Sequence, residues 1–145
     1  MVHRLMFLVI PLVLACGGPV GLLPGGRLSG ELEPAPGNWV FAGDYGYMEL
    51  ETRPADPYSV NLAYTVLDGV LYANAGDSET RWVKNIAADP QVRIRMGETL
   101  YSLRAERVTN AAELARFGRA WTGHGSFYRD PSELDVAYVF RLVAP

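Results

Sequence analysis

The stretch YSVNLAYTVLDGVLYAN, residues 58–74, decides the fold. Its first ten residues place Val60, Leu62, Tyr64 and Val66 on one face and Ser59, Asn61, Ala63 and Thr65 on the other. A period of two residues is typical of a strand with one buried face. Asp68-Gly69 follows directly, and this dipeptide favours a two-residue hairpin turn with positive φ angles. The stretch therefore predicts two antiparallel strands, residues 58–67 and 70–74.

The same pattern predicts a second hairpin further along the chain. Val92, Ile94 and Met96 alternate with Arg93 and Arg95, Gly97-Glu98 can turn the chain, and residues 100–108 return. The alternation slips between Ala105 and Val108, which predicts a β-bulge in the returning strand. With residues 47–53 and 136–143, the two hairpins give about six strands.

Two helices interrupt these strands. The first is predicted over residues 79–88, with Asp77 or Ser78 as its N-cap and Asp89-Pro90 as its stop. The second begins at Asn110 and ends at Gly123 and Gly125. Because hairpins dominate and helices are few, the predicted fold class is α+β, mainly β: a small antiparallel barrel with two helices rather than a parallel sheet.

The composition limits what such a domain can do. The chain has 145 residues, of which 49% are hydrophobic and 20% charged, which is enough for one folded domain. Lys and Arg number 13 against 16 Asp and Glu, and no basic run occurs, so nucleic-acid binding is not expected. No cluster of residues has the spacing of a metal site, and no glycine-rich phosphate loop is present.

The amino terminus predicts export. A charged start precedes the apolar run Leu5–Ala15, which is too short to span a bilayer and is typical of a signal peptide. Residues 13–17, Val-Leu-Ala-Cys-Gly, resemble the lipobox of bacterial lipoproteins, which implies cleavage before Cys16 and acylation of its thiol. The alternative is that Cys16 is a small apolar residue within a disposable signal.

Half of the 22 residues from Gly17 to Asn38 are Gly or Pro, which predicts a flexible, partly extended linker. The predicted organisation is a signal peptide (1–15), a lipidated cysteine with linker (16–38) and a barrel domain (39–145). The expected location is the bacterial cell envelope, with the lipid anchor in the outer membrane or on the outer face of the cytoplasmic membrane. Gly17, standing where an aspartate would signal inner-membrane retention, slightly favours the outer membrane.

The barrel sequence resembles the deazaflavin-dependent nitroreductase family of split-barrel flavin-binding proteins, a wider group that includes pyridoxamine-phosphate oxidases. The resemblance rests on residues 68–72, 74–76 and 81–94 and on Gly97, and is most specific in Trp82-x-x-Asn85 leading to Asp89-Pro90. It implies a split barrel that holds an isoalloxazine-type ring against the end of the first hairpin and the start of the first helix. Carried over, the residues near the ring are Asn74, Ala75, Gly76, Trp82, Lys84 and Asn85.

The family's phosphate-binding turn corresponds here to residues 53–59, Arg-Pro-Ala-Asp-Pro-Tyr-Ser. Arg53 and Ser59 match the family's basic and hydroxyl residues, whereas the two prolines lack backbone donors and Asp56 repels a phosphate. The cofactor is therefore left open: FMN, FAD or deazaflavin, with haem less favoured and His124 as a candidate axial ligand. No catalytic residue is assigned.

Each of these side chains also has a purely structural interpretation. Trp82 at helical spacing is typical of a core residue, and Asn85 can tie the helix to a strand. Lys84 can lie on a solvated face, and Arg53 can pair with Glu51 or Asp56. Two functions follow: an envelope oxidoreductase that reduces a small acceptor, or a non-enzymatic envelope lipoprotein that uses the barrel to bind a small molecule or a partner. The resemblance also implies a possible homodimer.

Overall fold

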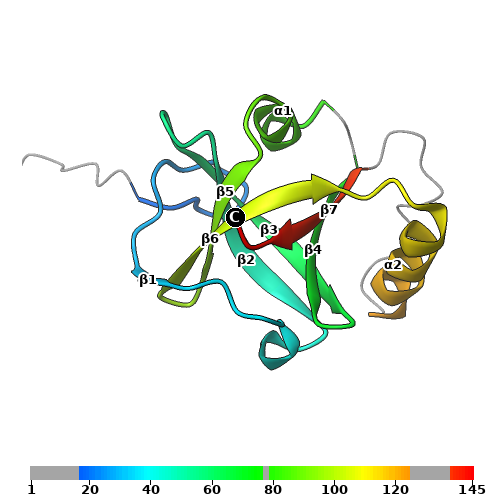
Figure 1. The fold of residues 1–145 in the computed structure, drawn as a ribbon. Helices are drawn as coiled ribbons and strands as arrows, with labels where there is room; N and C mark the ends of the chain where they lie inside the picture. Colours follow the sequence, from blue (N-terminus) through cyan, green and yellow to red (C-terminus); the bar gives the residue numbers. More distant parts are fainter. Residues whose placement is uncertain (1–16, 77–78, 125–137) are drawn as a thin grey trace, which may run out of the picture.

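The computed structural model describes residues 17–76, 79–124 and 138–145 and shows a barrel flanked by two helices (Figure 1). The strands are β1 (Glu31–Glu33), β2 (Tyr45–Thr52), β3 (Tyr58–Leu67), β4 (Val70–Ala75), β5 (Gln91–Met96), β6 (Thr99–Arg107) and β7 (Tyr138–Val143). They follow the order β1-β6-β5-β2-β3-β4-β7, and an additional pairing of β6 with β7 closes β2–β7 into a six-stranded antiparallel barrel. This confirms the predicted fold class.

The two predicted hairpins form at their predicted turns. Asp68 and Gly69 have φ angles of 53° and 76°, and the register pairs Leu67 with Val70. Gly97 has a φ of 61° in the second turn, between Met96 and Thr99. Positive φ at these positions matches the right-handed twist of the flanking strands.

The predicted bulge in β6 is wrong. Residues from Arg104 to Arg107 pair with β7 without an extra residue, and Val108 N continues the pattern by donating to Val139 O at 2.8 Å. The slip in hydrophobicity has another cause: Ala105 faces the barrel interior, whereas Val108 is buried on the outside of the barrel.

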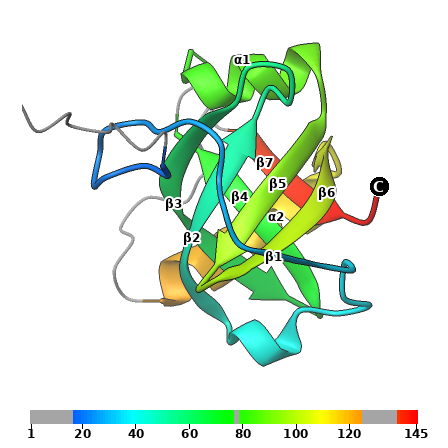
Figure 2. The same cartoon turned by 90° about the vertical axis from the view of Figure 1, so that its left-hand side faces the viewer.

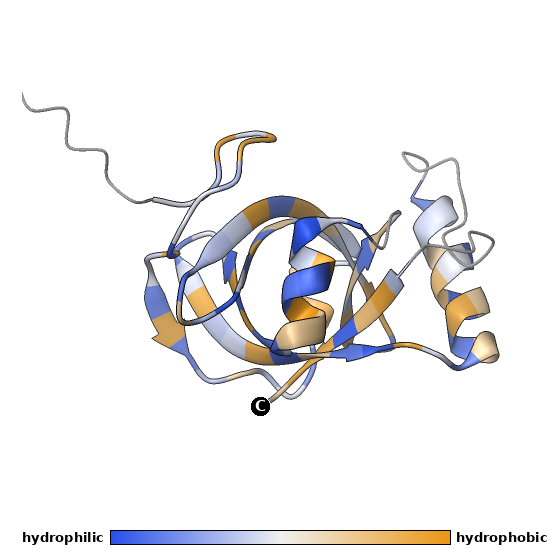
Figure 3. Cartoon of the chain, turned by 90° about the horizontal axis from the view of Figure 1, so that it is seen from above, coloured by the Kyte–Doolittle hydropathy of each residue, from blue (hydrophilic) through white to orange (hydrophobic). Residues whose placement is uncertain are grey.

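Helix α1 (Arg81–Ala88) lies across one end of the barrel, as the view from above shows (Figure 3). Its buried side chains Trp82, Val83 and Ile86 join the main core cluster, which fills the barrel interior with Leu50, Ile94 and other apolar residues. The helix begins two residues later than predicted, with Thr80 as its N-cap, and the predicted caps Asp77 and Ser78 lie outside the described residues.

Helix α2 (Ala111–Gly123) packs on the outside of the barrel (Figure 1). Asn110 caps it as predicted, because its side chain accepts from Glu113 N at 3.0 Å. Phe117, with no exposed surface, is the centre of a second apolar cluster with Tyr72, Val108 and Val139. The core is therefore divided by the sheet into an inner and an outer cluster.

Residues 17–33, which we call the strap, run over the outer face of β3, β2 and β5 and end in β1 beside β6 (Figure 2). Gly25 pairs with Ser59, and Leu28 has only 2% of its surface exposed. The glycine- and proline-rich composition predicts a flexible, partly extended linker here; in the structure this part of it is attached to the barrel by hydrogen bonds to Glu51 and Ser59. A short helical turn, η1 (Val40–Ala42), follows the strap.

The predicted signal peptide, Cys16, Gly125 and the first two residues of the last predicted strand lie outside the described residues. Among the helices that are described, none is long and apolar enough to cross a membrane.

Candidate functional site

Arg53 lies in the turn between β2 and β3 and is bound within that turn. Its Nε donates to Asp56 O at 2.7 Å, and its guanidinium pairs with the Asp56 carboxylate at 3.1 Å. Of the two partners left open by the sequence, Glu51 and Asp56, the structure shows Asp56. The one cation of the candidate phosphate turn is thus compensated by an acid three residues away.

Ser59 follows that turn and has no exposed surface. Its hydroxyl donates to Gly26 O at 2.7 Å, its N–H donates to Gly25 O, and its carbonyl accepts from Gly25 N, both at 2.9 Å. The strap therefore occupies every hydrogen-bonding group through which Ser59 would reach a phosphate.

The end of β4 carries the next three candidates. Ala75 is buried in the barrel core, and Asn74 is half-buried and pairs in register with Val139. Gly76 is exposed, and a Cβ built on it would meet no atom within 4 Å. Of the three, Gly76 is the one whose backbone an external group can approach closely.

The three candidates on α1 point in different directions. Trp82 is 5% exposed and lies against Phe140, with ring centroids 5.7 Å apart. Lys84 is exposed and pairs with Glu79 at 2.6 Å. Asn85 donates to Thr52 Oγ1 at 2.9 Å and so ties α1 to the end of β2.

Five of the eight predicted residues thus have structural partners: Arg53, Ser59, Trp82, Lys84 and Asn85. None of the eight lines either of the two pockets described below. Their role at a cofactor stays a prediction. His124, the haem-ligand candidate, stacks on Tyr45 with ring centroids 4.3 Å apart, and its Nε2 lies 3.3 Å from Thr65 Oγ1. Burial lowers the pKa of His124, and nearby Asp44 opposes that shift.

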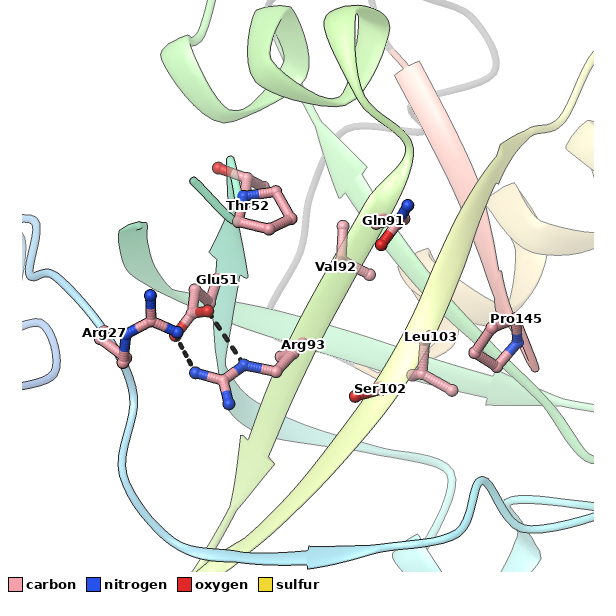
Figure 4. Close-up of a pocket in the computed structure, with 10 residues that line it drawn as sticks. Arg27, Glu51, Thr52, Gln91, Val92, Arg93, Ser102, Leu103 and Pro145 are labelled. Carbon is pink, nitrogen blue, oxygen red and sulfur yellow. Dashed lines mark hydrogen bonds and ion pairs between the residues drawn. The ribbon is translucent and has the colours of Figure 1, made fainter. Parts of the chain in front are cut away.

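The structure also shows a nearly buried ion pair that the sequence analysis did not predict. Glu51 and Arg93 are register partners on β2 and β5, and Glu51 is 3% exposed. Arg93 donates from Nε to Glu51 Oε1 at 2.9 Å and from a terminal nitrogen to Oε2 at 2.8 Å (Figure 4). Glu49 and Arg95 repeat the arrangement two residues away. The sequence did carry an indication of these pairs: two acids on one predicted strand and two arginines on another, each two residues apart. Residues at that spacing share one face of a strand and can pair across neighbouring strands.

The strap uses both pairs as anchors. Leu28 N donates to Glu51 Oε2 at 2.6 Å, and Leu28 O accepts from Arg93 at 3.1 Å. Arg95 donates to Ser29 O at 2.9 Å. A pocket of about 200 Å³ opens beside the first pair, with Arg27, Gln91 and Pro145 at its margin (Figure 4). Since Glu51 and Arg93 satisfy each other and the strap, the pair holds structure together rather than presenting a free charge.

A second pocket, of about 330 Å³, lies between α1 and the strands β6 and β7. It is lined by Val83, Ile86, Ala87, Ala105, Arg107, Tyr138 and Phe140. Arg107 is its one charged residue, and the guanidinium carbon lies 3.6 Å from the centroid of the Tyr138 ring. An apolar floor with a single cation at its edge suits a flat apolar ligand that carries a negative charge.

Two tests limit the chemistry of the described part of the chain. No group of three or more His, Cys, Asp or Glu side chains there is placed to hold a metal ion. A phosphate-bearing cofactor does not fit the turn at residues 53–59, because Arg53 is compensated by Asp56 and Ser59 is covered by the strap.

The comparisons with known proteins bear on the fold and on one segment of the sequence. No curated protein matches the chain. Solved structures of similar shape include a NimC/NimA family protein from Clostridium acetobutylicum, with a TM-score of 0.55 and 13% identity over 67% of this chain and 73% of that one. A candidate pyridoxamine 5′-phosphate oxidase from Listeria innocua has a TM-score of 0.55 and 14% identity over 68% and 82% of the two chains. General Stress Protein 26 from Bacillus anthracis has a TM-score of 0.53 and 17% identity over 68% and 78%.

The TM-scores show a shared fold and no more, because the sequence identities are low. A comparison with protein-family models is more specific. Residues 63–131 match the family model described as F420H(2)-dependent quinone reductase. That range includes α1 with its Trp82-x-x-Asn85 pattern and both strands of the second hairpin. F420 is the deazaflavin coenzyme, so the match agrees with the resemblance drawn from the sequence. Over this segment, slightly less than half of the chain, the sequence is similar to the F420H(2)-dependent quinone reductase family.

Proposed function

We propose that this chain is an envelope lipoprotein whose split barrel binds a small apolar ligand. We also propose that it lacks the contacts with which the resembled family binds a cofactor phosphate. The observation that carries the proposal is Ser59, whose hydroxyl and backbone are all bonded to the strap. A phosphate would have to displace Gly25 and Gly26 before it could reach that residue. It would then meet Asp56, whose charge is of the wrong sign.

The pocket between α1 and β6–β7 supports the binding half of the proposal. Its volume of about 330 Å³ is at the lower end of ordinary ligand sites. Val83, Ile86 and Phe140 are buried beneath it and offer an apolar surface to a ring. Arg107 pairs with no carboxylate of the described residues, so an anionic group on the ligand would find a cation there.

The location half of the proposal is supported by the sequence of the amino terminus. The apolar run Leu5–Ala15 leads directly to Cys16, the chain's one cysteine. Several acyl chains on that residue would hold the protein at a membrane, because each buried methylene contributes about 0.8 kcal/mol. Detection of acyl mass on Cys16 in protein purified from cells tests this half independently.

The family match favours a second candidate, an oxidoreductase that uses a flavin or deazaflavin ring. Such a cofactor would supply the redox chemistry, and the protein would bind and orient the ring. Of the residues that the resemblance places near the ring, Gly76 has open space for an external ring. The two candidates differ in what they bind, so a binding experiment separates them.

The test uses the full lipidated chain in lipid nanodiscs, with empty nanodiscs as the blank. Naphthalene-1-sulfonate, a flat apolar anion, is titrated by calorimetry against the wild type and two α1 variants. Ala87→Phe should weaken binding at least tenfold because Ala87 lines the pocket, whereas Ala88→Phe changes the neighbouring exposed residue and should leave binding unchanged. Arg107→Gln should weaken binding of the anion more than binding of naphthalene itself.

The same protein is then mixed with FMN, FAD, the deazaflavin coenzyme and haemin, and absorbance spectra are recorded. The proposal expects no spectral change with any of the four. A flavin or deazaflavin spectrum that shifts on binding, and that is weakened by Arg53→Gln or Asn85→Ala, would establish the oxidoreductase instead.

A further inference from the structure

Residues Val20–Leu23 form an apolar loop at the start of the strap, and it projects away from the barrel (Figure 3). The exposed fractions are 74% for Val20, 103% for Leu22 and 69% for Leu23. Isolated exposed leucines are ordinary on protein surfaces, whereas three large apolar side chains at one protruding tip require an explanation.

The loop is preformed. Val20 N donates to Leu23 O at 3.0 Å, Leu23 N donates to Val20 O at 2.9 Å, and Gly21 supplies the positive φ of 57° that the turn requires. Because these backbone groups are already paired, moving the tip out of water exposes fewer unsatisfied polar groups to an apolar medium.

The loop is also fixed in its orientation relative to the barrel. At its base, Gly26 N donates to Gly17 O at 3.2 Å, and a Cβ on Gly25 would lie 2.4 Å from the Gly18 carbonyl carbon. On its barrel side, Asn61 Nδ2 donates to Gly21 O at 3.0 Å. These contacts fix the direction of the tip, so the three apolar side chains do not fold back onto the protein.

The position of the loop in the chain indicates which surface it contacts. Only three residues separate Val20 from Cys16, so Val20 can lie at most about 14 Å from that cysteine and Leu23 at most about 25 Å. No charged residue occurs between Gly17 and Gly26. If Cys16 carries acyl chains embedded in a membrane, the apolar tip is held within reach of the same lipid surface, and a protein partner would have to compete with that surface.

We propose that the loop Val20–Leu23 inserts its side chains into the lipid surface to which the acylated Cys16 is anchored, and thereby orients the barrel on the membrane. This inference rests on the proposed lipoprotein. Burial of three large apolar side chains adds to the anchor, and the fixed strap transmits the orientation to the barrel.

The experiment uses the full lipidated chain carrying Leu22→Cys. Acylation blocks Cys16, so the introduced thiol is the one site for an environment-sensitive fluorophore such as NBD. The labelled protein is reconstituted into vesicles of phosphatidylethanolamine and phosphatidylglycerol. We expect the emission to shift to shorter wavelength and to be quenched by spin-labelled lipid, and we expect a further Leu23→Asp change to reverse both effects.

Val40→Cys provides the matched control, because Val40 is 67% exposed on η1, far along the chain from the anchor. A fluorophore there should report water. If the protein sediments with vesicles and carries acyl mass on Cys16 while position 22 also reports water, the loop does not insert and the lipoprotein stands. If Cys16 is unmodified and the protein does not sediment, the proposed lipoprotein is wrong, and this inference is wrong with it.

Discussion

Tyr72 is 3% exposed and joins β4 to α2 through one side-chain hydrogen bond. Its hydroxyl donates to Glu113 Oε1 at 2.8 Å. Burial, followed by the hydrogen bond and charge of Glu113, raises the pKa of Tyr72 to about 12. The neutral phenol is therefore part of the attachment of α2.

Replacing Tyr72 by Phe should lower the free energy of unfolding by about 1–2 kcal/mol, because a buried bond to a carboxylate is lost. It should also change the alkaline limb of the stability curve. A pKa raised above the unfolded value of about 10 stabilises the fold below pH 10, and this stabilisation is lost between pH 10 and 12. Urea unfolding at pH 8 and pH 11 should show a smaller loss in Tyr72→Phe. Tyr47→Phe, at a 76% exposed position, should behave like the wild type at both values.

The pKa of His124 is shifted in the opposite direction to that of Tyr72, so His124 affects stability at acid pH. Burial lowers its pKa, so the unfolded chain takes up a proton from His124 at higher pH than the folded protein does. Stability is therefore complete above the unfolded pKa of about 6.5 and falls as the pH drops below it. His124→Gln should reduce this acid loss when urea midpoints at pH 7.5 and 5.5 are compared.

Asp44→Asn offers an internal check on His124. Asp44 raises the pKa of His124 against the effect of burial, so removing its charge should widen the gap between the folded and unfolded pKa values. The loss of stability on acidification should then be larger than in the wild type. A smaller loss would mean that the charge of Asp44 does not act on His124 in the folded protein.

Side chains near Ser59 show what sequence reasoning can and cannot reach at this scale. The alternation of residues 58–67 placed Ser59 on the face opposite the core, and this was enough to predict the strand. Its hydroxyl is made inaccessible to a ligand by a hydrogen bond to Gly26, which is 33 residues away in sequence. A partner at such a distance leaves no local pattern, whereas the partner of Arg53 lies three residues away and was among the two alternatives.

At the scale of elements, the hairpins and both helices were predictable because each carries its own periodicity and turn residues. The strap was not, because its glycines and prolines are typical of a linker whether or not it is attached. What attaches it is the backbone of Leu28, which uses the Glu51–Arg93 pair on two strands. Backbone donors carry no sequence signal, so the paired acids and arginines were the only available indication.

Glu51→Gln should release the strap, because it removes one partner of a nearly buried ion pair that also accepts from Leu28 N. Breaking such a pair costs about 3 kcal/mol or more, since the remaining charge stays poorly solvated. Hydrogen exchange should accelerate first at the amide of Leu28 and along residues 25–33. Lys84→Gln breaks an exposed ion pair and should change stability by less than about 1 kcal/mol. Equal effects of the two substitutions would mean that the buried pair does not hold the strap.

At the scale of the whole molecule, the barrel sheet separates two apolar clusters. The inner cluster contains Leu103 and is closed by α1, whereas the outer cluster contains Phe117 and attaches α2. Outside the outer cluster, helix α2 is joined to strands by polar contacts of Glu113, which accepts from Tyr72 and pairs with Arg141. The division suggests that α2 can detach while the barrel remains folded.

Native-state hydrogen exchange of two truncations tests this division. Phe117→Ala and Leu103→Ala each remove a side chain that is at most 2% exposed, and each should cost about 2–5 kcal/mol. If α2 detaches separately, Leu103→Ala destabilises the intact and the α2-detached states equally. It should then accelerate exchange in β2–β6 and leave the α2 amides unchanged. Phe117→Ala destabilises only the intact state, so it should accelerate exchange in both regions by the same factor. Acceleration of the α2 amides in Leu103→Ala would instead show that the helix and the barrel unfold as one cooperative unit.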